Sequence, residues 1–304
     1  MLSQLLDGAE IHGLHRLSGG ASRETWRFEA DGRPLILQRQ RAGDERDMLI
    51  EAGVVRAAGR GGAPVPELIE ARRRDDGMAF MVLEAIDGET IARKILRDDE
   101  FATARPRLVA DFGAALARIH ALDVTTITGL QHTDQVEYYT GVLDVLGQPH
   151  PVLELVRNWL VDTRPAPGRT SLVHGDFRLG NMIVGPDGLR AVIDWELAHL
   201  GDPMEDLGWL CVKAWRFGMT PPVAGLGEYD DLFAAYEASG GSPVDPVVVH
   251  WWEVLGTWKW AIMCILQANV HLTGAARSHE LAAIGRRVCE NEYDLLAMLE
   301  TVVT

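Results

Sequence analysis

The 304-residue sequence has no long hydrophobic run and contains few cysteines. No stretch approaches the roughly 18 uninterrupted apolar residues of a membrane-spanning helix, so no membrane partner is expected. The opening residues, MLSQLLDGAE, lack both a basic region and an apolar core, and no signal peptide is expected. The three cysteines, Cys211, Cys264 and Cys289, are far apart and form no C-x-x-C pair. This pattern predicts reduced, mostly buried thiols and a cytoplasmic location.

Basic residues are also scarce. The formal net charge is −15, of which −2 falls in residues 1–110 and −13 in residues 111–304. A nucleic-acid partner is not expected, because neutralising phosphates requires a basic face. The acidic second part fits metal ions or a cationic substrate, or it is solvated surface that favours solubility. The content of 47% hydrophobic and 24% charged residues is typical of a globular protein, either one large domain or two closely associated lobes.

The first 86 residues are predicted to be rich in strands. A helix is expected over residues 44–58, with Glu51 near its middle. Strands are expected at residues 14–17, 25–29, 35–38, 67–71 and 79–83. The loop at residues 18–22 is short and rich in backbone N–H donors, so it either covers phosphates or forms a tight hairpin turn. It is not a P-loop, because no G-x-x-x-x-G-K-[ST] occurs in the chain.

The pattern breaks at residues 84–88, which we predict as the boundary between a small lobe of residues 1–86 and a larger helical lobe of residues 87–304. Residues 123–150 are predicted to be irregular. Helices are expected at residues 108–122, 151–161, 206–216, 228–238, 246–270 and 276–302.

Residues 171–209 carry most of the chemistry. Short strands are expected at residues 171–173, 182–184 and 191–193, with a hairpin turn at Gly-Pro-Asp-Gly 185–188. Carboxylates at the ends of such strands can converge on one point, as a divalent cation requires. The acidic or amide residues that we consider for this convergence are Asp176, Asn181, Asp194, Asp202 and Asp206.

Three of these residues fit phosphoryl transfer. A carboxylate such as Asp176 can accept a proton, while Asn181 and Asp194 supply the few hard oxygen ligands that Mg²⁺ prefers.

The motifs H-G-D-F-R-L-G-N at 174–181 and I-D-W-E at 193–196 resemble the catalytic and metal-binding motifs of the aminoglycoside phosphotransferase family, to which choline kinases are related. The wording of 171–209 is most similar to the kinase-like domains associated with acyl-CoA dehydrogenases. The resemblance implies an α+β, protein-kinase-like fold with a small strand-rich nucleotide-binding lobe and a larger, mainly helical lobe. It also implies ATP- and Mg²⁺-dependent transfer of the γ-phosphate to a hydroxyl of a small molecule.

The resemblance also implies roles for single residues. Asp176 would be the catalytic base, and Asn181 and Asp194 would bind the Mg²⁺ that bridges the ATP phosphates. Glu51 would be the helix carboxylate that faces the nucleotide, and Ser22 would contact phosphate. The linker from Glu84 to Ile86 would bind adenine through its backbone. Of Asp202 and Asp206, one would hold the catalytic-loop backbone and the other would cap a helix. His174 would be a structural histidine.

The sequence departs from the family in the third strand, where a lysine usually pairs with the helix glutamate and holds the α- and β-phosphates. The only lysines are Lys94, Lys213 and Lys259, and none lies in that strand. The simplest alignment puts Gln38 at the lysine position, whereas a one-residue bulge would put Arg39 there. Arginine could clamp phosphate, but glutamine contributes no charge.

The acceptor is less well defined by the sequence. The tryptophans of residues 250–267 either wall a pocket or belong to the core, and Lys259 and His271 are candidate substrate contacts. The acidic second part favours an amino-sugar or amine, whereas the closest resemblance favours a hydroxyacyl-CoA or related hydroxy acid. Two other functions stay open: a nucleotide-binding, pseudokinase-like module with little transfer activity, and a metal-dependent hydrolase using His174, Asp176 and His199. The sequence indicates no particular oligomeric state.

Overall fold

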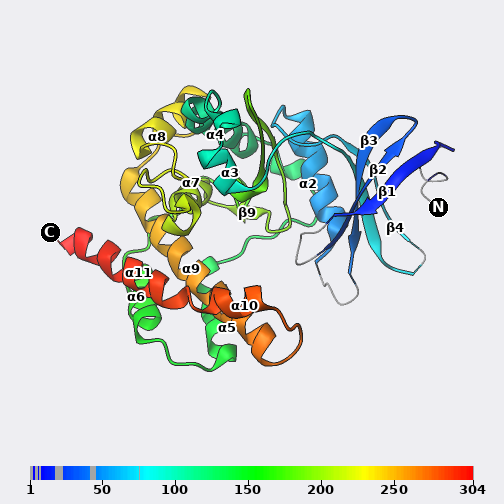
Figure 1. The fold of residues 1–304 in the computed structure, drawn as a ribbon. Helices are drawn as coiled ribbons and strands as arrows, with labels where there is room; N and C mark the ends of the chain where they lie inside the picture. The colour runs from blue at the N-terminus through cyan, green and yellow to red at the C-terminus, as the bar shows by residue number, and fades with distance from the viewer. Residues whose placement is uncertain are drawn as a thin grey trace.

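The computed structural model describes residues 3, 6, 8–17, 23–41, 46–74 and 76–303, with side chains described up to residue 300. In this part of the chain one lobe is a five-stranded sheet with a helix, and the other is mainly helical (Figure 1). The expected two-lobed α+β arrangement is therefore confirmed. Ser22 and its loop at 18–22 lie outside the described residues.

Five antiparallel strands make the smaller lobe, in the order β1-β2-β3-β5-β4. Asp31 and Gly32, at φ 49° and 78°, form the tight turn between β2 and β3, a conformation that Asp and Gly tolerate. Alternation buries Phe28, Leu35 and Val82 on the outer face. The opposite face borders the space between the lobes. The strands are β1 (Ile11–Arg16), β2 (Arg23–Ala30), β3 (Arg33–Gln40), β4 (Leu68–Arg73) and β5 (Ala79–Glu84).

Helix α2 (Met48–Arg60) packs on β4 and β5 and lies between the sheet and the helical lobe (Figure 1). The Asp47 side chain caps it by accepting a hydrogen bond from the Leu49 N–H at 3.0 Å. One buried face holds Met48, Ala52 and Val55, and Glu51 is buried with them. The segment 85–91 then joins β5 to the helical lobe and is tied to the strand at Val184 by the Glu89 backbone. The predicted boundary at 86/87 falls in this segment.

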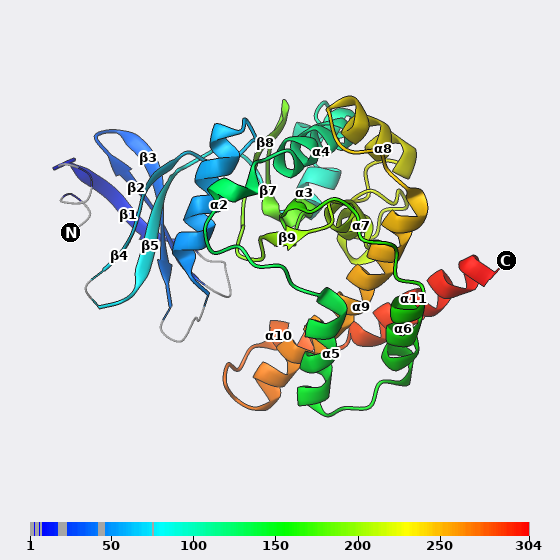
Figure 2. The ribbon, with the colours of Figure 1, turned by 180° about the vertical axis from the view of Figure 1, so that it is seen from behind.

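Helix α9 runs through the helical lobe and contacts α5, α6, α7, α10 and α11 (Figure 2). Its Trp251, Trp258 and Trp260 are buried in the core of that lobe, whereas Trp252 is partly buried and lines a cavity together with Trp251, so each of the two alternatives holds in part. None of the helices in the described part of the chain is long and apolar enough to cross a membrane. The helices are α3 (Ala92–Arg97), α4 (Arg105–His120), α5 (Gln135–Leu146), α6 (Pro151–Asp162), α7 (Met204–Cys211), α8 (Tyr229–Ala238), α9 (Pro246–Leu272), α10 (His279–Gly285) and α11 (Val288–Val303).

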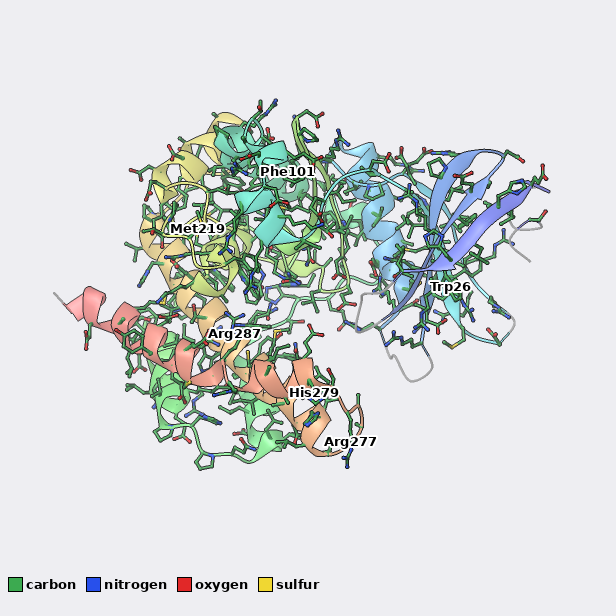
Figure 3. The ribbon with its side chains drawn as sticks, in the orientation of Figure 1. Trp26, Phe101, Met219, Arg277, His279 and Arg287 are labelled. Atoms are coloured by element: carbon green, nitrogen blue, oxygen red, sulfur yellow. The ribbon has the colours of Figure 1, made fainter. Side chains whose placement is uncertain are left out.

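Two helix predictions were wrong. The supposedly irregular residues 123–150 contain α5, whose Asp134 side chain accepts from the N–H groups of Val136 and Glu137 and whose Gly147 ends it at φ 64°. The single helix expected at 276–302 is two helices, α10 and α11, with Arg287 between them (Figure 3). The chain turns there because Gly285 lies against α9 so closely that a Cβ would meet the Ala268 Cβ at 2.6 Å.

The strands of residues 171–209 form two small sheets. β7 (Met182–Gly185) and β8 (Gly188–Val192) make the expected hairpin around 185–188. β6 (Ser171–Val173) pairs with β9 (His199–Gly201) and not with the hairpin, so the predicted grouping of these strands was wrong. Strand β9 was missed because it is only three residues long and begins with a polar histidine.

Candidate active site

The loop after β6 carries Asp176 and is held by a buried carboxylate. Asp206 accepts hydrogen bonds from the backbone N–H groups of His174 and Gly175, at 2.8 and 2.9 Å, and bonds to His120 Nε2 at 3.1 Å. Gly175 has φ 78°, and a Cβ there would meet the Leu197 carbonyl at 2.6 Å. The expected supporting role of Asp206 is confirmed. So is that of Asp202, whose side chain accepts from the Met204 N–H at the start of α7.

Burial and hydrogen bonding set the ionisation of this support. Burial alone would raise the pKa of Asp206, but the hydrogen bonds from His120 and the loop backbone lower it below its usual range. Burial lowers the pKa of His174, which is fully buried. The His174 ring bonds to the Ile193 carbonyl at 3.1 Å and to the Asp176 N–H at 3.2 Å. Both ring nitrogens are thus engaged, as expected of a structural histidine and not of a metal ligand.

Three side chains orient the Asp176 carboxylate. Its Oδ1 accepts from Trp209 Nε1 at 2.9 Å and from Arg178 Nε at 3.0 Å, and its Oδ2 accepts from Asn181 Nδ2 at 2.6 Å. The Arg178 guanidinium also lies 5.0 Å from the Trp215 ring centroid. The sequence-based reasoning missed Arg178 and Trp209, although both lie in the 171–209 stretch.

Asn181 contacts Asp176, and Asp194 lies close enough to be affected by the Asp176 charge. The Asn181 amide nitrogen bonds to both the side chain and the backbone carbonyl of Asp176, which leaves its Oδ1 as a ligand atom. Asp194 adopts φ 68°, and within the described residues its carboxylate has no hydrogen bond or ion pair. The Asp194 side chain is solvent-exposed at the edge of its site, but partial desolvation by the surrounding residues, followed by repulsion from Glu196, Asp176 and Glu51, raises its pKa to about 7.

These oxygen donors fit Mg²⁺ better than they fit a metal ion that prefers histidine or cysteine ligands, such as Zn²⁺. A carboxylate without a partner, among other carboxylates and beside an amide oxygen, is stabilised by added positive charge. Mg²⁺ is commonly held by one or two protein ligands together with phosphates and water. Among the described residues, no three His, Cys, Asp or Glu side chains are placed to hold a metal together. The geometry gives no support to the hydrolase alternative, since both ring nitrogens of His199 are also engaged.

Trp195 lies between a cavity of about 410 Å³ and a second cavity of about 330 Å³, and it lines both. We call the 410 Å³ cavity, which lies under the sheet, the interlobe cavity. The interlobe cavity measures 410 Å³ and is walled by apolar side chains from both lobes, including Ile36 and Ile183. In the described part of the chain, the Ile86 N–H and C=O make no backbone hydrogen bond, so they are free to bind a planar base. The structure brings six predicted residues into its lining: Gln38, Glu51, Glu84, Ile86, Asn181 and Asp194.

Arg39 is not brought into this group. The pairing of β2 with β3 runs without a bulge, so Gln38 faces the interlobe cavity and Arg39 faces the other side. Arg39 lies 3.8 Å from Glu24 instead.

Arg23, at the start of β2, is a cavity residue that the sequence-based reasoning did not single out. Its guanidinium forms an ion pair with Glu51 and bonds to Gln38 Oε1 at 3.4 Å. Burial raises the pKa of Glu51, and the adjacent guanidinium counteracts that effect. The signal was available in the sequence, because residues 23, 25 and 27 alternate onto the strand face that Gln38 shares.

The second cavity measures 330 Å³ and lies between α2, α5 and α9. Tyr138 and Tyr139 line it, and so does Lys259, which is only 3% exposed. Lys259 Nζ donates to the Gly175 carbonyl at 3.2 Å, so this cavity ends one residue from Asp176. His271, the other candidate substrate contact, is not part of its lining and accepts a bond from the Ser278 N–H.

Comparison with known proteins agrees with this geometry. The profile of the phosphotransferase enzyme family matches residues 13–245. Acyl-CoA dehydrogenase family member 10 of Mus musculus is 26% identical over 227 residues, which cover 69% of this chain but only 21% of that protein. The chain therefore spans about a fifth of this curated relative.

Two solved structures share the fold. One, from Ralstonia eutropha, has a provisional assignment as an aminoglycoside phosphotransferase. It superposes on this chain with a TM-score of 0.76 and 20% sequence identity, and the match covers 96% of this chain and 93% of the other. The other is aminoglycoside phosphotransferase APH(4)-Ia in complex with AMP-PNP and hygromycin B, with a TM-score of 0.67, 16% identity, and coverage of 96% and 94%. At these identities the likeness shows the fold alone, which is the expected protein-kinase-like one. With the family match over most of its length, the chain belongs to the phosphotransferase enzyme family.

Proposed function

We propose that this protein transfers the γ-phosphoryl group of ATP, with Mg²⁺, to a hydroxyl of a small molecule. The observation that carries the proposal is the contact of Asp176 with Asn181 at 2.6 Å, near the Asp194 carboxylate, which has no hydrogen bond or ion pair among the described residues. Such a set supplies a proton acceptor and oxygen ligands at one point, and the interlobe cavity provides room for a nucleotide next to it.

In this proposal each part of the chain has a defined task. The backbone of Glu84 to Ile86 binds the base at the apolar end of the interlobe cavity. Asp176 accepts the proton of the acceptor hydroxyl, and Trp209 and Arg178 hold its carboxylate in one orientation. Asn181 and Asp194 would hold Mg²⁺, which supplies neutralisation of charge on the transferring phosphate.

The second cavity is proposed as the acceptor site. Its charged lining residues balance, with Arg23, Arg46 and Lys259 against Asp47, Glu51 and Glu196. A polycationic amino-sugar would need an excess of carboxylates there, so this lining does not favour it, and we propose a hydroxyacyl-CoA or related hydroxy acid instead. The name of the mouse relative, an acyl-CoA dehydrogenase family member, supports the same choice. A cytoplasmic location is part of this proposal.

The test compares the wild-type protein with Asp176→Asn in assays of nucleotide binding and product formation. Thermal-shift titration with ATP and Mg²⁺ should stabilise both proteins, because Asp176 does not hold the nucleotide. Phosphorylated product from a panel of hydroxyacyl-CoAs, hydroxy acids and aminoglycosides should appear with the wild type and fall by roughly 10²- to 10⁴-fold with Asp176→Asn.

The same data distinguish the proposed kinase from the alternative of a nucleotide-binding module with little transfer activity. That alternative is favoured by the presence of Gln38 at the usual lysine position. That alternative expects stabilisation by ATP but no product from any acceptor. No stabilisation of the wild type at millimolar ATP would count against both functions.

A further inference from the structure

Arg23 is a buried arginine whose hydrogen bonds are incomplete. The residue is 6% exposed, its Nη atoms contact Glu51 and Gln38, and Nη2 also lies 3.7 Å from the Glu196 carboxylate. Its Nε–H has no hydrogen-bond partner in the described part of the chain. A buried unpaired donor costs about 1–3 kcal/mol, so a group that persists in this state points to a ligand that completes it.

The Arg23 side chain lines the interlobe cavity, together with the polar residues Gln38 and Glu51. Strand alternation puts Arg23, Thr25 and Arg27 on the cavity side of β2, whereas Trp26 (labelled in Figure 3) packs against the outer core. Arg23 also lines the second cavity, so its guanidinium stands between the two spaces. A negative group bound there would lie where nucleotide and acceptor approach each other.

No lysine is available for this task. Lys94 pairs with Glu89 on the surface, and Lys213 pairs with Asp294. Lys259 donates to the Gly175 carbonyl, on the side of the second cavity. Among the described residues, the basic side chains that line the interlobe cavity are Arg23, which is buried, and Arg27, which is partly exposed and lies 3.2 Å from the exposed Asp87.

Resting on the function proposed above, we propose that Arg23 of β2 binds the phosphates of the nucleotide and that Gln38 of β3 positions it. In the usual family arrangement the phosphate-binding cation is a lysine of the third strand, whereas in this proposal the cation is on β2 and the β3 residue supports it. The guanidinium comes from β2 and pairs with Glu51, while Gln38 accepts one of its N–H groups at 3.4 Å. A guanidinium has five donors in a planar fork, so it can keep the contacts to Glu51 and Gln38 and still bind a phosphate oxygen.

The experiment is calorimetric titration of the full chain with AMP-PNP, ADP and adenosine in the presence of Mg²⁺. Arg23→Met should weaken binding of AMP-PNP and ADP by about 10- to 100-fold, the effect of losing a charge-assisted hydrogen bond. Adenosine affinity should stay within about twofold, since the base and ribose do not reach Arg23 in this proposal. Adding Gln38→Lys to Arg23→Met should restore most of the loss by returning a cation to the same group from β3. Arg33→Met, which removes an exposed arginine of the same sheet that pairs with Glu67, is the matched control and should change nothing.

Arg23→Met leaves the Glu51 carboxylate buried without its partner, so the titrations are repeated with Arg23→Met/Glu51→Gln, in which that charge is removed. The same selective loss for phosphate-bearing ligands is expected there. Unchanged AMP-PNP affinity in either variant would overturn the proposal, and so would an equal loss for adenosine, which would indicate a purely structural role. If the wild type binds neither AMP-PNP nor ADP, the proposed function itself fails. If the wild type binds both and the variants bind as well, only the role of Arg23 fails.

Discussion

Replacing Asp206 by asparagine tests how the Asp176 loop is supported. One oxygen of the Asp206 carboxylate accepts from the His174 N–H and His120, and the other accepts from the Gly175 N–H. In Asp206→Asn one of these oxygens becomes an NH₂ group that faces a donor. At least one buried N–H therefore loses its acceptor, and the charge-assisted contacts lose their charge.

The expected loss of unfolding free energy is about 3–5 kcal/mol, the usual cost of breaking a buried charged contact by changing one partner. Asp202→Asn is the matched control, because Asp202 accepts one N–H, that of Met204, and asparagine caps helices almost as well as aspartate. Its expected loss is below about 1 kcal/mol.

The stabilisation by Asp206 should also depend on pH. Because the pKa of Asp206 is lower in the folded protein than its ordinary value of 3.8, the folded state favours the ionised carboxyl. Its contribution is complete above pH 3.8 and is lost as the pH falls from there through the folded pKa. The difference in unfolding free energy between the wild type and Asp206→Asn should therefore become smaller under strongly acidic conditions. His120 and His174, the titratable groups that face Asp206, are present in both proteins.

Urea unfolding at pH 7 and at about pH 3, followed by tryptophan fluorescence, measures both effects. A loss below 1 kcal/mol at pH 7, or a loss equal to that of Asp202→Asn, would refute the assignment of Asp206 as the main support of the loop. A gap that does not change with pH would refute the part of the reasoning that concerns its ionisation.

Two further predictions concern catalysis and packing. Trp209→Phe removes the N–H that bonds to Asp176 at 2.9 Å, so kcat should fall roughly tenfold at unchanged nucleotide KM; an unchanged kcat would contradict the orienting role. Gly113→Ala should lower the unfolding free energy, measured with urea, by about 1–3 kcal/mol, because the added Cβ would lie 2.7 Å from the backbone nitrogen of Tyr236. In Gly141→Ala, in α5, the added Cβ meets open space, so this substitution should raise the unfolding free energy by up to about 1 kcal/mol. Equal effects of the two alanines would argue against this close helix contact.

The elements of the fold were predictable where local signals agree. The alternation in β2, β3 and β5 and the Gly-Pro-Asp-Gly turn of the β7–β8 hairpin are local patterns, and the structure has them in place. Helix α5 was also signalled locally, by Asp134 at its start and Gly147 at its end, but those signals were not used. Strand β9 carries almost no local signal, because three residues form a strand only when β6 is beside them.

The 171–209 stretch by itself carries the residues on which the proposed chemistry rests. Its motif places Asp176, Asn181 and Asp194 within one short segment, and the loops between its strands are too short to separate them widely. The supporting role of Asp206 could likewise be inferred from that segment.

Only the tertiary structure decided which charged groups complete the site. Arg23 and Glu51 lie on different elements and meet because α2 packs on the sheet, a contact between residues distant in sequence. Lys259 reaches the Gly175 carbonyl from α9, 84 residues further along the chain. Strand spacing placed Gln38 on the cavity face, but the cation beside it comes from the neighbouring strand. A sequence pattern fixes which face a side chain occupies, and the packing of separate elements decides what that side chain meets there.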